Sequence, residues 1–202
     1  MPYNAVWDEK TKVPTEIAGF EDLVFLFTSS HNNRGILRMD FDEAVFLWKI
    51  AKQTPPGGYL VEIGRAEGGS TILLAAATEK IGTVVSFDND PVNDKLLSQT
   101  IAAAGLYAEL FVADSQTYDT SKLEFPVHFL FIDGEHTYEG VKRDFDNWWE
   151  TIIVGGILVL HDVDDMTLMN TGPSFLYPEI LKMDNFEEIG RAGSVRALRR
   201  IK

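Results

Sequence analysis

One stretch of the chain decides the fold: residues 59–71, which read Tyr-Leu-Val-Glu-Ile-Gly-Arg-Ala-Glu-Gly-Gly-Ser-Thr. It begins with a short apolar run, turns at glycines and continues into residues 72–77, which read Ile-Leu-Leu-Ala-Ala-Ala and favour a helix. A strand, a glycine loop and a helix in this order are typical of the first unit of a nucleotide-binding α/β domain. Glycines let the backbone turn sharply and approach a ligand closely, because they have no Cβ atom. We therefore expect a cofactor at this loop.

The details of the loop favour S-adenosylmethionine over a dinucleotide. Its glycines follow the spacing G-x-x-x-G-G, whereas the dinucleotide fingerprint is G-x-G-x-x-G. Glu62 lies at the end of the expected strand, where a carboxylate would repel a pyrophosphate and attract a cationic group. S-adenosylmethionine carries an ammonium and a sulfonium and no phosphate. A glycine-rich turn in some other α/β protein is the alternative.

The composition is that of one globular domain. The 202 residues are 45% hydrophobic and 24% charged, and this length suits a single core. A net charge of −13 would repel nucleic acid and anionic membranes, so we expect neither as a partner. The absence of cysteine excludes disulfides, thiolate metal sites and a cysteine nucleophile. No stretch resembles a signal peptide or a membrane span, so we expect a cytoplasmic protein, and a homo-oligomer is left open.

Strands and helices alternate along most of the chain. Apolar strands are expected at residues 59–63, 83–87, 108–112, 127–132 and 156–160, with helices at 91–104 and 138–152. This alternation predicts a parallel sheet covered on both faces, a Rossmann-like three-layer α/β sandwich. The last two strands, 186–189 and 195–201, are joined by too few residues for a crossover helix and must be antiparallel.

The segment before the first strand is expected to be helical. The spacing of apolar residues after Pro14 predicts a helix over residues 15–27. Asp40 begins a second helix, with Glu43 in the capping-box position. We therefore divide the chain into an N-terminal helical extension, residues 1–58, and a cofactor-binding domain, residues 59–202. Whether the extension covers the cofactor or only packs on the sheet is left open.

Acidic residues follow the strands at the edge where ligands bind in open parallel sheets. Asp88, about twenty residues beyond the glycine loop, is placed to accept hydrogen bonds from ribose hydroxyls. Asp90 is a natural N-cap for the next helix. Asp114 and Ser115 could bind the adenine amino group, although a lone aspartate after a strand is also common in turns.

A second polar group follows the fourth and fifth strands. His136 lies three residues after Asp133 on a loop, and an imidazole near neutral pKa is usable as a general base. Adjacent parallel strands bring Asp133 close to His161 and Asp162. Two carboxylates and an imidazole at one rim could bind a divalent cation, with Mg²⁺ or Mn²⁺ favoured by oxygen ligands. The alternative is that His161 ends its strand and Asp162 caps the following loop.

Four segments together resemble the class I S-adenosylmethionine-dependent methyltransferases. They are residues 61–70, 87–88, 131–138 (Phe-Ile-Asp-Gly-Glu-His-Thr-Tyr) and 155–163 (Gly-Gly-Ile-Leu-Val-Leu-His-Asp-Val). The branch they resemble contains macrocin-type sugar O-methyltransferases and cephalosporin-hydroxylase-like proteins, and the resemblance covers roughly residues 40–200. It implies a seven-stranded, mostly parallel sheet whose last strand is inserted antiparallel.

The resemblance also implies roles for individual residues. The implied cofactor contacts are Glu62, Gly64, Gly68, Asp88 and Asp114, and we add Arg65, Ser70 and Asp133 as candidate cofactor residues. The implied metal ligands are Asp133 and Asp162, to which we add His161 as a candidate, and the implied base is His136, with Asp133 as a second candidate catalytic residue. One departure is His161-Asp162, since metal-binding relatives often carry Glu-Asp at these positions.

These observations predict an O-methyltransferase for a small-molecule acceptor, most simply a sugar or glycoside hydroxyl or another polyol, with a catechol as the alternative. The loops 29–35 and 164–178 are expected to form the acceptor pocket. Two other classes stay open. Tyr138 and Lys142 spell the Tyr-x-x-x-Lys pair of short-chain NAD-dependent oxidoreductases, although the matching glycine loop is missing. The third class is a protein that binds S-adenosylmethionine without catalysis.

Overall fold

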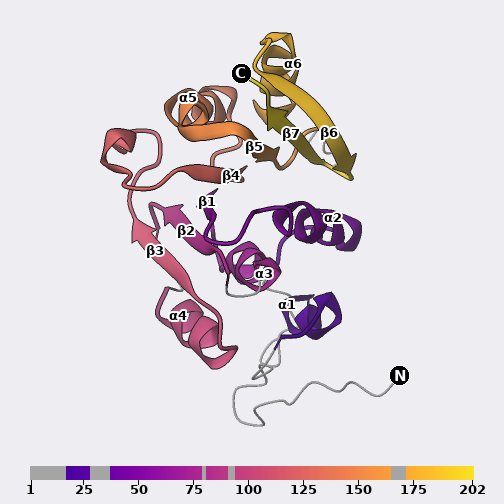
Figure 1. Ribbon diagram of the computed structural model, residues 1–202, viewed down its shortest axis with the longest axis vertical. Helices are drawn as coiled ribbons and strands as arrows, with labels where there is room; N and C mark the ends of the chain where they lie inside the picture. Colours follow the sequence, from indigo (N-terminus) through magenta and orange to yellow (C-terminus); the bar gives the residue numbers. More distant parts are fainter. Residues whose placement is uncertain (1–16, 28–36, 79–80, 91–93, 165–171) are drawn as a thin grey trace.

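A computed structural model describes residues 17–27, 37–78, 81–90, 94–164 and 172–202. At its centre lies a seven-stranded sheet with the order β3-β2-β1-β4-β5-β7-β6 (Figure 1). The strands are β1 (Tyr59–Ile63), β2 (Thr83–Asp88), β3 (Ala108–Val112), β4 (Val127–Ile132), β5 (Ile152–Leu160), β6 (Phe186–Ala192) and β7 (Val195–Arg200). Strands β1 to β5 are parallel to one another, and β7 is antiparallel to both β5 and β6. The predicted Rossmann-like sandwich with an antiparallel last strand is confirmed.

Helices cover both faces of this sheet (Figure 1). On one side lie α1 (Val24–Phe27), α2 (Phe41–Ala51), α3 (Gly69–Ala77) and α4 (Asp94–Ala103). On the other side lie α5 (Tyr138–Trp148) and α6 (Gly172–Lys182). Short 3-10 turns are found at Phe20–Leu23, Thr120–Lys122 and Trp149–Thr151. Among the described helices, none is long and apolar enough to cross a membrane.

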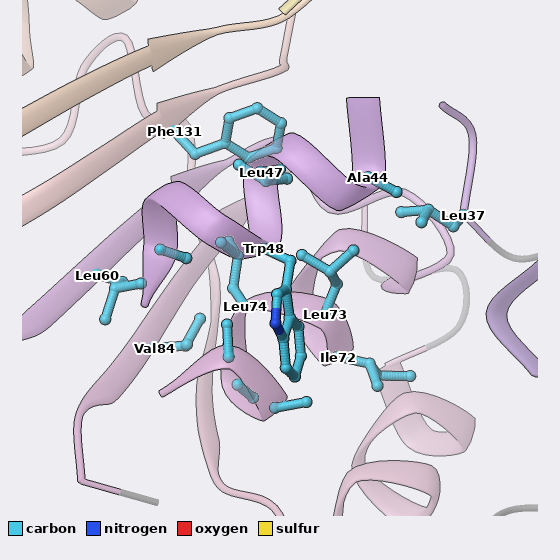
Figure 2. Packing of buried hydrophobic residues seen from close by; sticks show 14 of the residues in the cluster. Leu37, Ala44, Leu47, Trp48, Leu60, Ile72, Leu73, Leu74, Val84 and Phe131 are labelled. Atoms are coloured by element: carbon cyan, nitrogen blue, oxygen red, sulfur yellow. The ribbon is translucent and has the colours of Figure 1, made fainter. Parts of the chain in front are cut away.

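Alternate residues of the strands point into two hydrophobic cores. Leu60 and Val84 belong to the core that α2 and α3 cover, and Figure 2 shows Trp48 of α2 beside Leu73 of α3 and Leu47 beside Phe131. Their neighbours Val61 and Val85 point to the opposite core, beneath α5 and α6. All residues of α3 are buried, because α2 packs on the side that the sheet leaves open. Helix α2, from the expected N-terminal extension, is therefore part of the central packing.

The boundary between α5 and β5 differs from the prediction. The helix expected over residues 138–152 ends at Trp148, and Ile152 is the first residue of β5. The strand, expected to start at residue 156, is therefore longer and passes through Gly155 with φ +86°. Trp148 and Ile152 both point into the core beneath α5. Because apolar residues four apart are also typical of one helix face, their spacing predicted one continuous helix.

The segment 164–178, expected to be a loop, contains most of α6 from residue 172 onward. Leu176, Tyr177 and Ile180 of this helix are buried against α5 and the sheet. Pro173 suits the first turn of a helix, but Pro178 lies inside it and masked the helical pattern. The described residues do not include 165–171 of that loop, the loop 29–35, or residues 15–16 and 91–93 of two predicted helices.

Candidate active site

Backbone hydrogen bonds join the ends of the central strands beyond the regular pairing. The Gly64 N–H donates to the Phe87 carbonyl at 2.9 Å, and the Asp133 N–H donates to the Ile63 carbonyl at 2.9 Å. The His161 N–H donates to Ile132 at 3.2 Å. These bonds hold the ends of β2, β1, β4 and β5 side by side. The polar residues predicted at the strand ends therefore lie along one rim.

Two glycines of the loop after β1 adopt left-handed backbone conformations. Gly64 has φ +84°, and a Cβ atom there would lie 2.2 Å from the Asp133 carbonyl oxygen. Gly68 has φ +85°, and a Cβ atom there would lie 2.4 Å from Leu97 of α4. Both conformations favour glycine, and both contacts leave no room for a side chain. The glycines thus let the loop pack closely against the β4 end and against α4.

Glu62 lies beneath this loop and is fully buried. Its Oε2 accepts hydrogen bonds from Thr71 Oγ1 at 2.5 Å and from Ser86 Oγ at 2.6 Å. Burial raises the pKa of Glu62, and the hydroxyls of Ser70, Ser86 and Thr71 oppose this rise. The carboxylate therefore connects β1 to β2 and α3 in the present structure.

Arg65 is also buried, with 2% of its surface exposed. Its guanidinium donates to both oxygens of Asp94 at 2.7 and 2.6 Å. It also donates to the carbonyls of Ser86 at 3.2 Å and Phe111 at 2.9 Å. The side chain ties the glycine loop to α4 and β3, so the structure places it in the scaffold beneath the rim.

A cleft of about 450 Å³ opens at the ends of β1, β2 and β3. Its lining contains Gly64, Asp88, Asp114 and Asp133, four of the predicted cofactor residues. Asp88 Oδ2 accepts the backbone N–H groups of Arg65 at 2.9 Å and Ala66 at 3.0 Å, which fixes the carboxylate beside the glycine loop. This volume lies within the range of small-molecule sites. We refer to it as the first cleft.

Asp144 of α5 also lines the first cleft, and sequence reasoning missed it. It is 1% exposed and accepts a hydrogen bond from Ser115 Oγ at 2.5 Å. Burial raises the pKa of Asp144 to about 6, although the Ser115 hydroxyl opposes this. A carboxylate on the apolar stripe of α5, beside Val141 and Phe145, was the signal that could have identified it.

A second cleft, of about 390 Å³, adjoins the first. The two share Gly64, Ala66, Asp133 and Gly134. The lining found only in the second cleft comprises Leu37, Arg38, Met39, Arg65, Gly69, Ser70, His136, His161 and Asp162. Asp133 thus lies where the two clefts meet, and the predicted base and metal residues lie on one side of it.

Two histidines and two aspartates form a compact group in the second cleft. His136 Nε2 lies 2.9 Å from Asp162 Oδ2 and 3.7 Å from Asp133 Oδ1. His161 Nδ1 lies 3.0 Å from Asp133 Oδ1 and 3.3 Å from Asp162 Oδ2. Asp162 has φ +57°, a left-handed conformation that is unusual for a residue other than glycine and often found at functional sites.

The charges of this group depend strongly on one another. Hydrogen bonds to Asp133 and Asp162 raise the pKa of His136 to about 10. Burial would lower the pKa of His161, but Asp133, Asp162 and Glu43 raise it to about 12. Burial would raise the pKa of Asp162, but both histidines hold it below its usual value. The two imidazole rings therefore hold their protons tightly, and Asp162 stays ionised beside them.

Asp133, His136 and Asp162 each offer one ligand atom, and these atoms lie within 4.8 Å of one another. The group differs from the predicted ligand set in one member, His136 in place of His161. His161 contacts the same two carboxylates, but its ring is 6% exposed and its Nε2 faces Glu43. Two carboxylates and an imidazole form a donor set that suits a divalent cation.

A family model described as a methyltransferase domain matches residues 61–163. The chain belongs to this methyltransferase family. The matched span begins in β1 and ends just after β5, so it contains the glycine loop, Asp88, Asp133, His136 and Asp162.

Solved structures share the fold of this methyltransferase at low sequence identity. An O-methyltransferase from Bacillus cereus in complex with SAH is 17% identical, with 89% of this chain and 88% of that chain covered and a TM-score of 0.63. Cofactor-bound Rv0187 from MTB is 18% identical, with 81% and 82% covered and a TM-score of 0.68. An rRNA methylase from Streptococcus thermophilus is 15% identical, with 79% and 94% covered and a TM-score of 0.59.

Glu43 contacts the candidate site through His161, and sequence reasoning missed this contact because Glu43 was expected only to cap α2. The capping contact is confirmed, with the Asp40 N–H donating to Glu43 Oε2 at 2.8 Å. Ser194 N–H and Oγ donate to Oε1 at 2.6 and 2.7 Å, and His161 Nε2 lies 3.4 Å from Oε2. Burial alone would raise the pKa of Glu43, but hydrogen bonds from His161, Ser194 and Asp40 bring it to about 2.

Proposed function

We propose that this chain is a class I S-adenosylmethionine-dependent O-methyltransferase for a small hydroxylated acceptor, with His136 as the base and assistance from a divalent cation. The observation that carries the proposal is the meeting of two clefts at Asp133. The first cleft offers acids for a cationic cofactor, and the second carries His136 and Asp162. A methyl donor and an acceptor in neighbouring clefts would meet at this residue.

The first cleft suits S-adenosylmethionine in its charge. Its acidic lining consists of Asp88, Asp114, Asp133, Glu135 and Asp144. Such a concentration of carboxylates attracts a cationic ligand and repels a pyrophosphate. Asp88 would accept from the ribose hydroxyls, and Asp114, at the end of β3, would face the adenine. When bound, S-adenosylmethionine supplies an electrophilic methyl group on its sulfonium.

His136 Nε2 is the atom that we assign to take the proton from the acceptor hydroxyl. Asp162 and Asp133 face this nitrogen at 2.9 and 3.7 Å, so they would stabilise the imidazolium that forms when it takes the proton. Asp133 and Asp162 would also hold a divalent cation, whose positive charge would make a nearby hydroxyl more acidic. A proton on His136 and a cation compete for the same carboxylates. A bound cation would therefore lower the pKa of His136 and favour its neutral, basic form.

A sugar or glycoside hydroxyl is the acceptor that we favour. The second cleft carries hydroxyl, imidazole, carboxylate and guanidinium groups beside the apolar Leu37 and Met39. Vicinal hydroxyls can bind one cation through two oxygens, which would position the reacting oxygen. The resemblance to macrocin-type sugar O-methyltransferases supports the same class. A net charge of −13 disfavours RNA, although one structural neighbour is an rRNA methylase.

A methyl-transfer screen tests this proposal. Labelled S-adenosylmethionine is incubated with sugars, glycosides, nucleotide sugars, catechols and an rRNA fragment, each with Mg²⁺, with Mn²⁺ or with a chelator. We expect carbohydrate turnover that depends on the cation and is lost in His136→Ala but kept in His128→Ala, whose ring contacts the β1 backbone. Turnover of catechols or RNA alone would overturn the acceptor class. Full activity under chelation would show that the reaction needs no cation. Full activity of His136→Ala would show that His136 is not the base.

The contacts of Tyr138 and Lys142 do not favour an oxidoreductase. Tyr138 Oη donates to Glu179 at 2.8 Å, and Lys142 Nζ lies 2.8 Å from Asp146 Oδ2. Both polar groups are thus engaged with carboxylates on α5 and α6. Calorimetry with S-adenosylmethionine and with NAD separates the classes. Binding of NAD alone would support the oxidoreductase, and binding of S-adenosylmethionine without any turnover would support a non-catalytic protein.

A further inference from the structure

The burial of Glu43 exceeds what a helix cap requires. A capping box needs one contact between the glutamate and the N-cap backbone, and this contact can be made at a solvated helix end. Glu43 is instead 5% exposed. Burying a carboxylate is unfavourable unless hydrogen bonds and opposite charges compensate. The compensation here comes from Ser194 and His161, which lie far from α2 in the sequence.

The turn between β6 and β7 fits around this carboxylate. Gly193 has φ +48°, and a Cβ atom there would lie 2.4 Å from Glu43 Oε1. Ser194 donates to the same oxygen through its backbone N–H at 2.6 Å and its hydroxyl at 2.7 Å. Three hydrogen bonds, with that from Asp40 to Oε2, therefore fix the carboxylate. In this orientation Oε2 faces His161.

His161 connects Glu43 to the junction of the two clefts. Its Nε2 lies 3.4 Å from Glu43 Oε2, and its Nδ1 lies 3.0 Å from Asp133 Oδ1. A ring with Glu43 at one nitrogen and with Asp133 and Asp162 at the other has one preferred orientation. Groups of this kind, one contact removed from the reacting residues, commonly orient the residues they support. Asp133 in turn faces His136 Nε2 at 3.7 Å.

We propose that Glu43 is a positioning residue of the active site, which acts through His161 to fix the Asp133 carboxylate where the two clefts meet. The inference rests on the proposed function and deepens it, because it makes a residue of α2 responsible for positioning an active-site carboxylate. Glu43 does not touch the reacting groups in this scheme. It sets the geometry of Asp133, which does.

Glu43→Gln tests this role against Asp42→Asn, a matched control. Asp42 is the preceding residue of α2, is exposed, and loses the same single negative charge on substitution. The first readout is the ring-nitrogen NMR spectrum of the free protein, with His136 as the reporter because its Nε2 faces the same Asp133 oxygen as His161 Nδ1. The second readout is the affinity for S-adenosylhomocysteine, and the third is kcat and KM for whichever acceptor the screen identifies. Ser194→Ala, which keeps the carboxylate charge, replaces Glu43→Gln if that variant does not fold.

We expect Glu43→Gln to shift the His136 ring resonances and to lower kcat roughly ten- to a hundred-fold. Affinity for S-adenosylhomocysteine should change less than twofold, and Asp42→Asn should match the wild type in every readout. A folded Glu43→Gln protein with unmoved His136 resonances, or with wild-type kcat, would overturn the inference. If no acceptor is turned over, the proposed function fails, and the His136 resonances alone decide whether Glu43 positions Asp133.

Discussion

The carbonyl oxygen of Asp133 lies 2.2 Å from the point that a Cβ atom would occupy on Gly64. Gly64→Ala would therefore force the β1 loop away from the β4 end, in addition to straining a backbone with φ +84°. Gly57→Ala is the matched control, because Gly57 has φ +75° and nothing within 4 Å of its Cβ position. The strain common to both substitutions is about 1–2 kcal/mol. We expect calorimetry to give Gly64→Ala a clearly lower melting temperature than Gly57→Ala. Equal melting temperatures would show that the loop can move aside.

The buried pair of Arg65 and Asp94 predicts a large stability effect. Asp94→Ala removes the carboxylate from a guanidinium whose side chain is 0% exposed. Breaking such a pair by removing one partner costs about 3–5 kcal/mol, and the two remaining carbonyl contacts place this case near the lower end. The exposed pair of Lys142 and Asp146 is the control, since Asp146→Ala should cost about 0–1 kcal/mol. Urea unfolding measures both, and similar losses would contradict the assignment.

The pKa of His161 predicts a stability that falls with rising pH. His161 has a folded-state pKa of about 12, against 6.5 for the free side chain, so the folded state binds the proton more tightly. This contribution is fully present below pH 6.5 and is lost as the pH rises toward 12. We expect the free energy of unfolding, measured with a chelator, to decline above pH 6.5. His161→Gln should flatten the decline, and His128→Gln is the matched control. An unchanged slope in His161→Gln would contradict the prediction.

The contacts of Asp88 predict its effect on cofactor affinity. Its carboxylate is held beside the glycine loop by two backbone N–H groups and would accept from the ribose. Loss of a charge-assisted hydrogen bond costs about 1.5–3 kcal/mol, which corresponds to roughly a ten- to hundred-fold weaker affinity for S-adenosylhomocysteine in Asp88→Ala. Asp90→Ala, an exposed neighbour, should bind like the wild type. Unchanged binding by folded Asp88→Ala would remove Asp88 from the cofactor site.

The sequence predicted the sheet and its rim well, because apolar strands followed by acids are local patterns. Asp88, Asp114, Asp133, His136 and Asp162 all line the two clefts as the strand order requires. The glycine spacing was also informative, although Gly68 makes room for Leu97 of α4. The apolar strands and the acids that follow them depend only on neighbours within the same strand and loop.

Residues whose role depends on distant partners could not be predicted in this way. Glu43 lies 151 positions from Ser194 in the sequence, so its capping pattern gave no indication of the contact. Arg65 seemed to belong to the cofactor loop, yet its partner Asp94 follows a whole strand later. Helix α6 was missed because Pro178 interrupts its pattern, while the burial of Leu176 and Ile180 stabilises it nonetheless.

The backbone bonds across the strand ends have a thermodynamic consequence for ligand binding. Gly64, Asp133 and His161 each donate their N–H to the neighbouring strand, so the floor of both clefts is already ordered. A ligand that binds there has little main-chain entropy to remove, and more of its contact energy remains as affinity. The same amide protons are engaged in these hydrogen bonds, so they should exchange with solvent slowly, both with and without ligand. Ligand-dependent protection should instead be found in the segment that lines the second cleft just before α2, residues 37–39.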